Sequence, residues 1–159
     1  MGIRWYGWDV TAEEAERARL DPWAVIRIAD DRHDVPGWSN TDLDKAWLPL
    51  QRLFSDPRHE RVFQPRPGFS LVEGDVRYLS SGEYEAHIGI LSAEQVRIIS
   101  DDVELVSRFD VRAFCRSWNA DGPRRAVSEE GYVLQFLEQA KDFAADAASR
   151  GHCVMYAIR

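Results

Sequence analysis

The chain lacks the features of secreted and membrane proteins. It has only two cysteines, Cys115 and Cys153, and their spacing fits neither a CxxC motif nor a disulfide framework. No apolar run approaches the roughly 18–20 residues that a membrane helix needs, and the first residues have no signal-peptide core. We therefore expect a cytoplasmic protein with reduced cysteines and no membrane partner.

Complete catalytic and metal-binding motifs are also missing. The sequence contains no GxSxG elbow, P-loop, GxGxxG or HExxH stretch, each of which would indicate a defined chemistry. Its histidines are His33, His59, His87 and His152, and none has the spacing of a zinc ligand. His152 and Cys153 are adjacent in an expected strand, so they face opposite sides and do not form a dyad. We expect no metal and no cofactor, and assign the histidines to the core or the surface.

An excess of positive charge is also missing, because acidic residues outnumber basic ones by 27 to 20. The formal net charge is −7, which disfavours nonspecific contact with nucleic acid, and no nucleic-acid partner is expected. What the chain does have is apolar and aromatic material: 45% hydrophobic residues and 18 aromatic residues in 159 support one core, as a single domain over residues 1–159. The tryptophans Trp5, Trp8, Trp38 and Trp47 all fall in the first third of the chain, so aromatic surface is concentrated there.

The hydrophobic patterns predict an α+β fold with a small, mostly antiparallel sheet. The expected strands lie near 3–10, 75–79, 84–91 and 152–158, and the main helices cover 42–54, 92–107 and 128–150. Both alternating sets of residues in 152–158 are apolar, which indicates a central strand that is covered on both faces. Helix ends are expected at Thr11, Asp21, Ser92, Asp110 and Ser128 as N-terminal caps, and at Gly151 as a left-handed C-terminal cap.

The 42–54 segment has one ambiguous position. Leu43, Trp47, Leu50 and Phe54 follow one another in steps of four, three and four, which places them on one face of a helix. Pro49 interrupts that helix because it has no N–H to donate. Two interpretations stay open: a kinked helix, or a helix that restarts with Pro49 in its first turn.

The same segment carries a resemblance to a known family. Asp42, Leu43, Asp44, Lys45 and Trp47 match in order the signature of the YfbM-like family of small bacterial proteins, a domain of unknown function. Further agreement comes from the aromatic strand before the Thr11 capping box, the run 76–79, and the stretch 150–152 before an apolar strand. The chain departs from the family at Thr41, where leucine is usual, and at Leu48 and Gln51, near which many relatives have histidines. The resemblance implies an α+β fold and no particular reaction.

Two interpretations apply to Asp42, Asp44, Lys45 and Trp47. In the structural one, the carboxylates interact with a helix N-terminus, Lys45 pairs with either of them, and Trp47 anchors the helix in the core. In the functional one, the three charged side chains line the rim of a pocket that has Trp47 as its floor. Two aspartates could also share a cation, but no complete metal motif accompanies them.

A second set of candidates is basic and aromatic. Arg58, Arg61, Arg66 and Arg77 form a local basic run, most of it within the long Pro- and Gly-containing loop 55–74, and could hold an anionic ligand or an acidic partner loop. The alternative is a solvated loop. Trp5 and Trp8 are added as candidate contact residues, because Trp and Arg are frequent interface anchors.

These observations support two main hypotheses about function. The first is a non-catalytic module that binds a protein or a small ligand through the Trp-rich first third and the Arg/Pro loop. The second is a small-molecule enzyme in which Asp42 or Asp44 is the acid or base and Lys45 or an arginine holds an anion. An immunity- or antitoxin-like role is a third possibility, since small acidic proteins can neutralise basic toxins.

Overall fold

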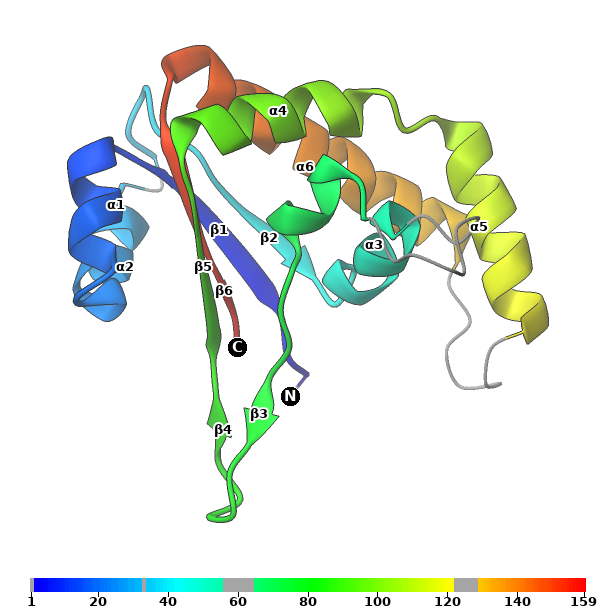
Figure 1. The fold of residues 1–159 in the computed structure, drawn as a ribbon, viewed down its shortest axis with the longest axis horizontal. Coiled ribbons are helices and arrows are strands. Elements are labelled where there is room, and N and C mark those ends of the chain that lie inside the picture. The colour runs from blue at the N-terminus through cyan, green and yellow to red at the C-terminus, as the bar shows by residue number, and fades with distance from the viewer. Residues whose placement is uncertain (1, 33, 56–64, 122–128) are drawn as a thin grey trace.

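A four-stranded antiparallel sheet with the order β2-β1-β6-β5 organises the molecule (Figure 1). The computed structural model describes residues 2–32, 34–55, 65–121 and 129–159. The strands of this sheet are β1 (Trp5–Val10), β2 (Asn40–Asp44), β5 (His87–Leu91) and β6 (Cys153–Ile158). The α+β class expected from the sequence is confirmed.

Strand β6 lies inside the sheet, between β1 and β5, and all six of its residues are buried. Each neighbour pairs with it in register: Trp5 and His87 both lie opposite Ile158. The prediction of a central strand covered on both faces is therefore confirmed, and the reason is that helices pack on both sides of the sheet.

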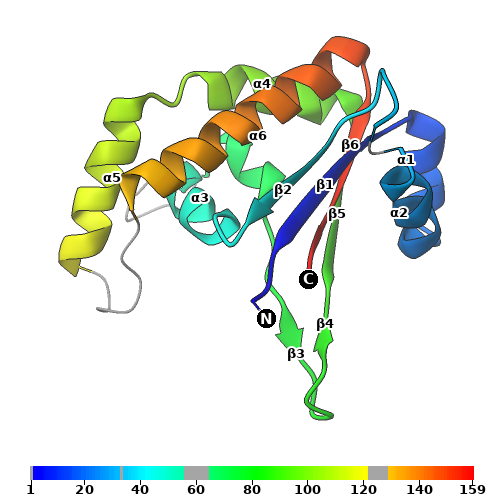
Figure 2. The same cartoon turned by 180° about the vertical axis from the view of Figure 1, so that it is seen from behind.

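The helices divide unequally between the two faces (Figures 1 and 2). On one face lie α3 (Trp47–Phe54), the 3₁₀ helix η1 (Pro67–Leu71), α4 (Ala93–Glu104), α5 (Arg108–Asp121) and α6 (Glu130–Arg150). On the other lie α1 (Ala12–Ala18) and α2 (Pro22–Asp30). The larger layer gathers Trp5, Leu137 and Tyr156 into one hydrophobic cluster. The smaller layer packs on a second cluster, which includes Trp8 and Met155. These two residues come from the same strands as Trp5 and Tyr156, β1 and β6, but face the other side of the sheet.

Most of the expected helix ends are confirmed. Thr11 and Ser92 form capping boxes, the Asp21 side chain accepts from the Ala24 N–H, and Gly151 adopts a left-handed φ of 66° after α6. The cap of α5 was assigned wrongly: Ser107 accepts from the Asp110 N–H while Asp110 accepts from the Ser107 N–H, so Asp110 is the reciprocal partner inside the helix. Ser128 lies outside the described residues, and α6 begins after Glu129.

The helix expected over 42–54 is wrong in its first part. Asn40–Asp44 is the edge strand β2, which pairs with β1, and the helix begins only at Trp47. A turn closed by the bond from the Ala46 N–H to the Leu43 carbonyl separates the two elements. Pro49 sits in the first turn of α3, so the open question is settled in favour of a restarting helix.

The strands expected over 75–79 and 84–91 are also corrected. Arg77–Tyr78 (β3) pairs only with Tyr84–Glu85 (β4), in a separate two-stranded sheet, while His87–Leu91 joins the main sheet as β5. This β3–β4 hairpin projects away from the helices and from the rest of the sheet (Figures 1 and 2). None of the described helices combines the length and the apolar character needed to cross a membrane.

Candidate functional site

The two aspartates of the signature segment are engaged by side chains of other elements. Arg4 Nη1 lies 3.3 Å from Asp42 Oδ2, and Arg4 Nε lies 3.2 Å from Asp44 Oδ1. The second contact is an ion pair without a hydrogen bond, since the shielded Asp44 Oδ1 accepts none. Tyr132 of α6 donates to Asp44 Oδ2 at 3.1 Å. Asp44 and then Asp42 raise the pKa of the Arg4 guanidinium, so the two carboxylates are held as one charged cluster.

The structural interpretation of this segment is correct for Trp47 and wrong for the two aspartates. The carboxylates do not cap a helix, because they belong to β2 and the N-cap of α3 is Ala46 without a side-chain bond. Trp47 is buried in the larger cluster and donates to the Ile3 carbonyl at 3.4 Å, as the core-anchor interpretation expected. Lys45 is exposed. A binding role for these residues stays a prediction.

The remaining sequence candidates separate into different environments. Trp5 and Trp8 are buried in the two clusters, one on each face of the sheet. Arg66 forms an ion pair with Asp102, whose carboxylate also accepts from the Gly68 N–H at 2.7 Å, so this arginine fastens η1 to α4. Arg58 and Arg61 lie outside the described residues. Only Arg77 is exposed beside a recess of the surface.

A buried polar cluster that the sequence did not indicate lies where α6 joins β6. Asp9 Oδ2 is 3.0 Å from Arg150 Nη1 and 3.2 Å from His152 Nδ1, and its Oδ1 accepts from the Ser39 N–H at 2.9 Å. A carboxylate against Nδ1 can orient an imidazole for acid–base chemistry. Here, however, Trp38 stacks on the His152 ring at 5.0 Å, and Arg150 compensates the charge. The cluster therefore ties loop 34–39 to the end of α6.

Trp38 extends this network to the smaller helical layer. The Arg32 guanidinium lies 3.9 Å from the centre of the Trp38 ring and makes a two-pronged ion pair with Glu14. The bond from Arg32 lowers the pKa of the Glu14 carboxyl, and the bond from the Thr11 N–H adds to the effect. Each cation of the network already has its anion, so it leaves no free charge for a ligand.

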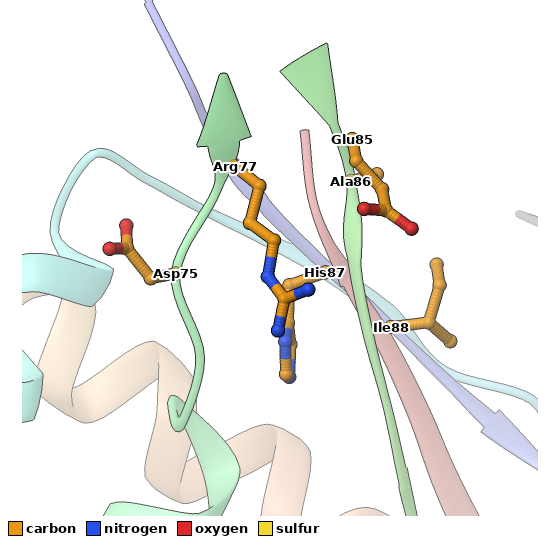
Figure 3. Close-up of a pocket in the computed structure, with 6 residues that line it drawn as sticks. All are labelled: Asp75, Arg77, Glu85, Ala86, His87 and Ile88. Atoms are coloured by element: carbon orange, nitrogen blue, oxygen red, sulfur yellow. The ribbon is translucent and has the colours of Figure 1, made fainter. Parts of the chain in front are cut away.

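One recess in the described surface lies at the base of the β3–β4 hairpin. It has a volume of about 220 Å³ and is lined by Asp75, Arg77, Glu85, Ala86, His87 and Ile88 (Figure 3). In that view the Arg77 side chain extends from β3 in the direction of His87, and Asp75 points to the other side. Burial lowers the pKa of His87, against the opposing effect of Glu73 and Asp75. Burial therefore favours the neutral form of this imidazole.

Close packing holds His87 at this position. A Cβ atom on Gly74, whose φ is 136°, would lie 2.3 Å from the imidazole, so only glycine fits there. On the neighbouring strand the Tyr156 ring lies 6.0 Å away, and its hydroxyl donates to the carbonyls of Ser70 and Glu73. Burial raises the pKa of Tyr156 well above its ordinary range. The segment that leads into β3 is thus fixed against β5 and β6.

The hairpin above the recess exposes aromatic side chains. Tyr78 is 75% exposed and Tyr84 is 49% exposed, and the two lie opposite each other in the β3–β4 pair. An isolated two-stranded hairpin is marginally stable in water at best. Two tyrosines on such a projection therefore present a surface that the described part of the molecule does not cover.

The two edges of the main sheet differ in how they are protected. The β2 edge carries the charged Asp42 and Asp44, is irregular where it pairs with β1, and receives the Gln139 side chain at Thr41 and Asp42. The β5 edge reads His-Ile-Gly-Ile-Leu, without a proline, a bulge or a formally charged side chain. Within the described residues β5 pairs only with β6. Natural edge strands usually carry a charge, a proline or a bulge that hinders pairing with a further strand. β5 has none of these features, so its outer edge is open to pairing.

Sequence reasoning missed most of this surface. Arg77 is the single sequence candidate that falls within it. Tyr78 and Tyr84 lie in the expected strands 75–79 and 84–91 without having been candidates, and His87 was expected in the core or at the surface. Their pattern indicated strands correctly, but the sheet order that leaves β5 at an edge depends on contacts with the distant β6. Among the described residues, no group of three or more His, Cys, Asp or Glu side chains is placed to hold a metal ion.

Comparison with known proteins identifies a shared fold. No protein-family model matches the chain, and no curated protein matches it in sequence. Among solved structures, the chain is similar to YfbM from Escherichia coli, a protein of unknown function, with a TM-score of 0.61 and 14% identity. The match covers 98% of this chain and 99% of that one. The resemblance to the YfbM-like family expected from the sequence is thus confirmed at the level of the fold.

Proposed function

We propose that this protein is a non-catalytic binding module that takes up an extended, basic segment of a partner protein along β5 and the β3–β4 hairpin. The observation that supports it is the unguarded outer edge of β5, which continues through Ala86 into a hairpin with two exposed tyrosines. The binding role is the one expected from the sequence, but the proposed binding surface is not the Trp-rich first third, where Trp5 and Trp8 are buried.

The backbone of β5 supplies the affinity in this mode. An extended peptide that adds a strand to a sheet gains a row of main-chain hydrogen bonds, and pockets for alternate side chains give specificity. His87, Ile88, Gly89 and Ile90 are all partly exposed, so a strand can approach them. The recess at His87 lies at the end of this edge and provides a place for one side chain of the bound segment.

Charge selects the kind of segment. Asp75 and Glu85 line the recess against a single arginine, Arg77, and Glu73 and Glu83 are close in sequence. The whole chain carries −7, which attracts a basic partner and repels a second copy of itself. A segment with alternating apolar residues and a lysine or arginine fits both the edge and the recess.

The direct test is selection of peptides from a random 12-residue library, followed by titration of the enriched peptides. We expect sequences of alternating apolar and basic residues that bind with micromolar affinity. On binding, amides of His87–Leu91 that face away from β6 should gain protection from hydrogen exchange. The Tyr78→Ser/Tyr84→Ser double variant should bind at least about tenfold more weakly, since exposed tyrosines often act as anchors of binding.

Phe109→Ser is the matched control for this experiment. Phe109 is 76% exposed but lies on α5, so its removal lowers surface hydrophobicity without touching the hairpin. Its affinity for the selected peptides should be unchanged. Equal weakening by both variants, protection of β2 in place of β5, or a selection that yields no binder would contradict the proposal.

The other hypotheses stay predictions. In the enzyme hypothesis Asp42 or Asp44 is the acid or base. Both carboxylates are paired with Arg4, and Asp44 also accepts a hydrogen bond from Tyr132. An immunity- or antitoxin-like role is one form of the module proposed here, in which the bound segment belongs to a basic toxin.

A further inference from the structure

Three aromatic rings surround one cation on the α1/α2 side of the sheet. The Cζ atom of Arg159 lies 5.0 Å from the centre of the Tyr6 ring, 5.9 Å from that of Trp8 and 5.7 Å from that of Trp23. Cations within about 6 Å of a ring centre are attracted by the π face. We call these three rings the aromatic cluster. Trp23 was not among the residues singled out from the sequence.

The cluster is built from two elements that meet over the sheet. Tyr6 and Trp8 are two residues apart in β1, so they share a face, and their rings are 6.4 Å apart at an angle of 23°. Trp8 is only 3% exposed, and its Nε1 donates to Asp30 Oδ1 at 2.7 Å, which fixes the ring. Trp23 comes from α2 and is 42% exposed, so the cluster is open to solvent on its side.

Arg159 is held differently at its backbone and at its side chain. Its N–H and C=O exchange hydrogen bonds with those of Arg4 at 2.8 and 2.7 Å. Among the described residues, no carboxylate forms an ion pair with the Arg159 guanidinium. Its side chain therefore lies on the rings through cation–π contact, and its backbone stays fixed if the side chain swings away.

We propose that the aromatic cluster is a binding site for a guanidinium group, occupied in this structure by Arg159 as an internal competitor. An arginine side chain of a partner, or a small guanidinium compound, takes the same place when the Arg159 side chain leaves. A planar guanidinium stacks on aromatic faces and is weakly hydrated, whereas an ammonium is not planar and keeps its water. The charge of −7 favours cations in general.

Competition by a tethered group has a measurable consequence. If Arg159 covers the rings in nine of ten molecules, the apparent affinity for an external guanidinium is about tenfold below the intrinsic one. Removing the side chain should restore the intrinsic affinity. This expectation does not depend on the function proposed for β5, because it concerns different residues on another surface of the molecule.

The test titrates methylguanidinium into wild-type protein and into Arg159→Ala, with the indole N–H signals of Trp8 and Trp23 followed by NMR at constant ionic strength. We expect saturable shifts in both, with an affinity about tenfold higher for Arg159→Ala. Arg159→Gln, which replaces the guanidinium by a shorter, neutral amide, should behave like Arg159→Ala. The Trp38 indole, which stacks on Arg32 and His152, should not respond.

An additional variant tests the location of the site, and additional ligands identify the class of its natural ligand. Adding Trp23→Ala to Arg159→Ala should weaken binding several-fold, and N-acetyl-arginine methylamide should bind as well as methylguanidinium if an arginine side chain is the natural ligand. A preference for methylguanidinium over that amide would identify a free small molecule as the ligand. The proposal is wrong if Arg159→Ala binds no more tightly than wild type, if Trp23→Ala has no effect, or if tetramethylammonium binds equally well.

Discussion

Asp44 combines three constraints in one residue. Its φ is 48°, and among the described residues it is the only one other than glycine with a positive φ. Aspartate and asparagine tolerate this left-handed region better than other side chains with a Cβ. The carboxylate also accepts from Tyr132 and pairs with Arg4. The signature aspartate therefore sets the turn that separates β2 from α3.

Replacement of Asp44 should distinguish the backbone constraint from the charge. We expect Asp44→Ala to lower the free energy of unfolding by about 2 kcal/mol, through a strained left-handed alanine and one lost hydrogen bond. Asp44→Asn should cost less than Asp44→Ala, because asparagine also tolerates the left-handed region and only the partly exposed ion pair with Arg4 is lost. Urea denaturation measures both. Equal costs for the two variants would show that charge, and not φ, makes aspartate necessary there.

At the scale of elements, one side chain of α3 holds the segment that leads into the hairpin. Gln51 Nε2 donates to the carbonyls of Val72 and Gly74 at 2.6 and 2.7 Å. These bonds lie between η1 and β3, beside the Gly74–His87 contact that shapes the recess. Gln51 thus couples the larger helical layer to the proposed binding surface.

Loss of this donor should destabilise the segment. We expect Gln51→Met, which keeps the length of the side chain, to lower the free energy of unfolding by about 1–3 kcal/mol, because two carbonyls lose their donor. Amides of 75–78 should exchange faster with solvent. Leu48→Ala, on the exposed side of the same helix, is the control and should leave that exchange unchanged. An effect no larger than that of Leu48→Ala would contradict the role given to Gln51.

At the scale of the whole molecule, the two hydrophobic clusters share the strands β1 and β6. Trp5 and Tyr156 belong to one cluster, and Trp8 and Met155 to the other. Because neighbouring residues of the same strands enter both clusters, one cluster cannot separate without disturbing the other. We therefore expect both clusters to unfold together, as one domain over 1–159. This expectation from the sequence stays a prediction.

One core variant on each side of the sheet tests this prediction. Ile26→Ala and Leu137→Ala remove buried side chains from the smaller and the larger cluster, and each should cost about 2–5 kcal/mol. Both variants should unfold in a single thermal transition at a lower Tm, with the same midpoint by tryptophan fluorescence and by far-UV circular dichroism. Two separate transitions in Ile26→Ala would mean that α1 and α2 unfold as an independent unit.

The segment 42–54 has a local pattern that two different structures can satisfy. The spacing of the four apolar residues fits a helix, yet Leu43 is buried from the strand β2, and Trp47, Leu50 and Phe54 are buried from α3. A helical period and a strand followed by a turn can place the same residues inward. The pairing of 40–44 with β1, in which Gly7 lies opposite Thr41, makes this stretch a strand and not a helix. The local sequence pattern contains no information about that pairing.

Local patterns were enough to predict the α+β class, the capping boxes at Thr11 and Ser92, the left-handed Gly151 and the central position of β6. These features depend on local hydrogen bonds and on the period of apolar residues. Tertiary contacts were needed to show which strands lie at the edges, which tryptophans are buried and which rings meet Arg159. These depend on contacts between residues far apart in the chain, and the candidate binding surfaces arise from them.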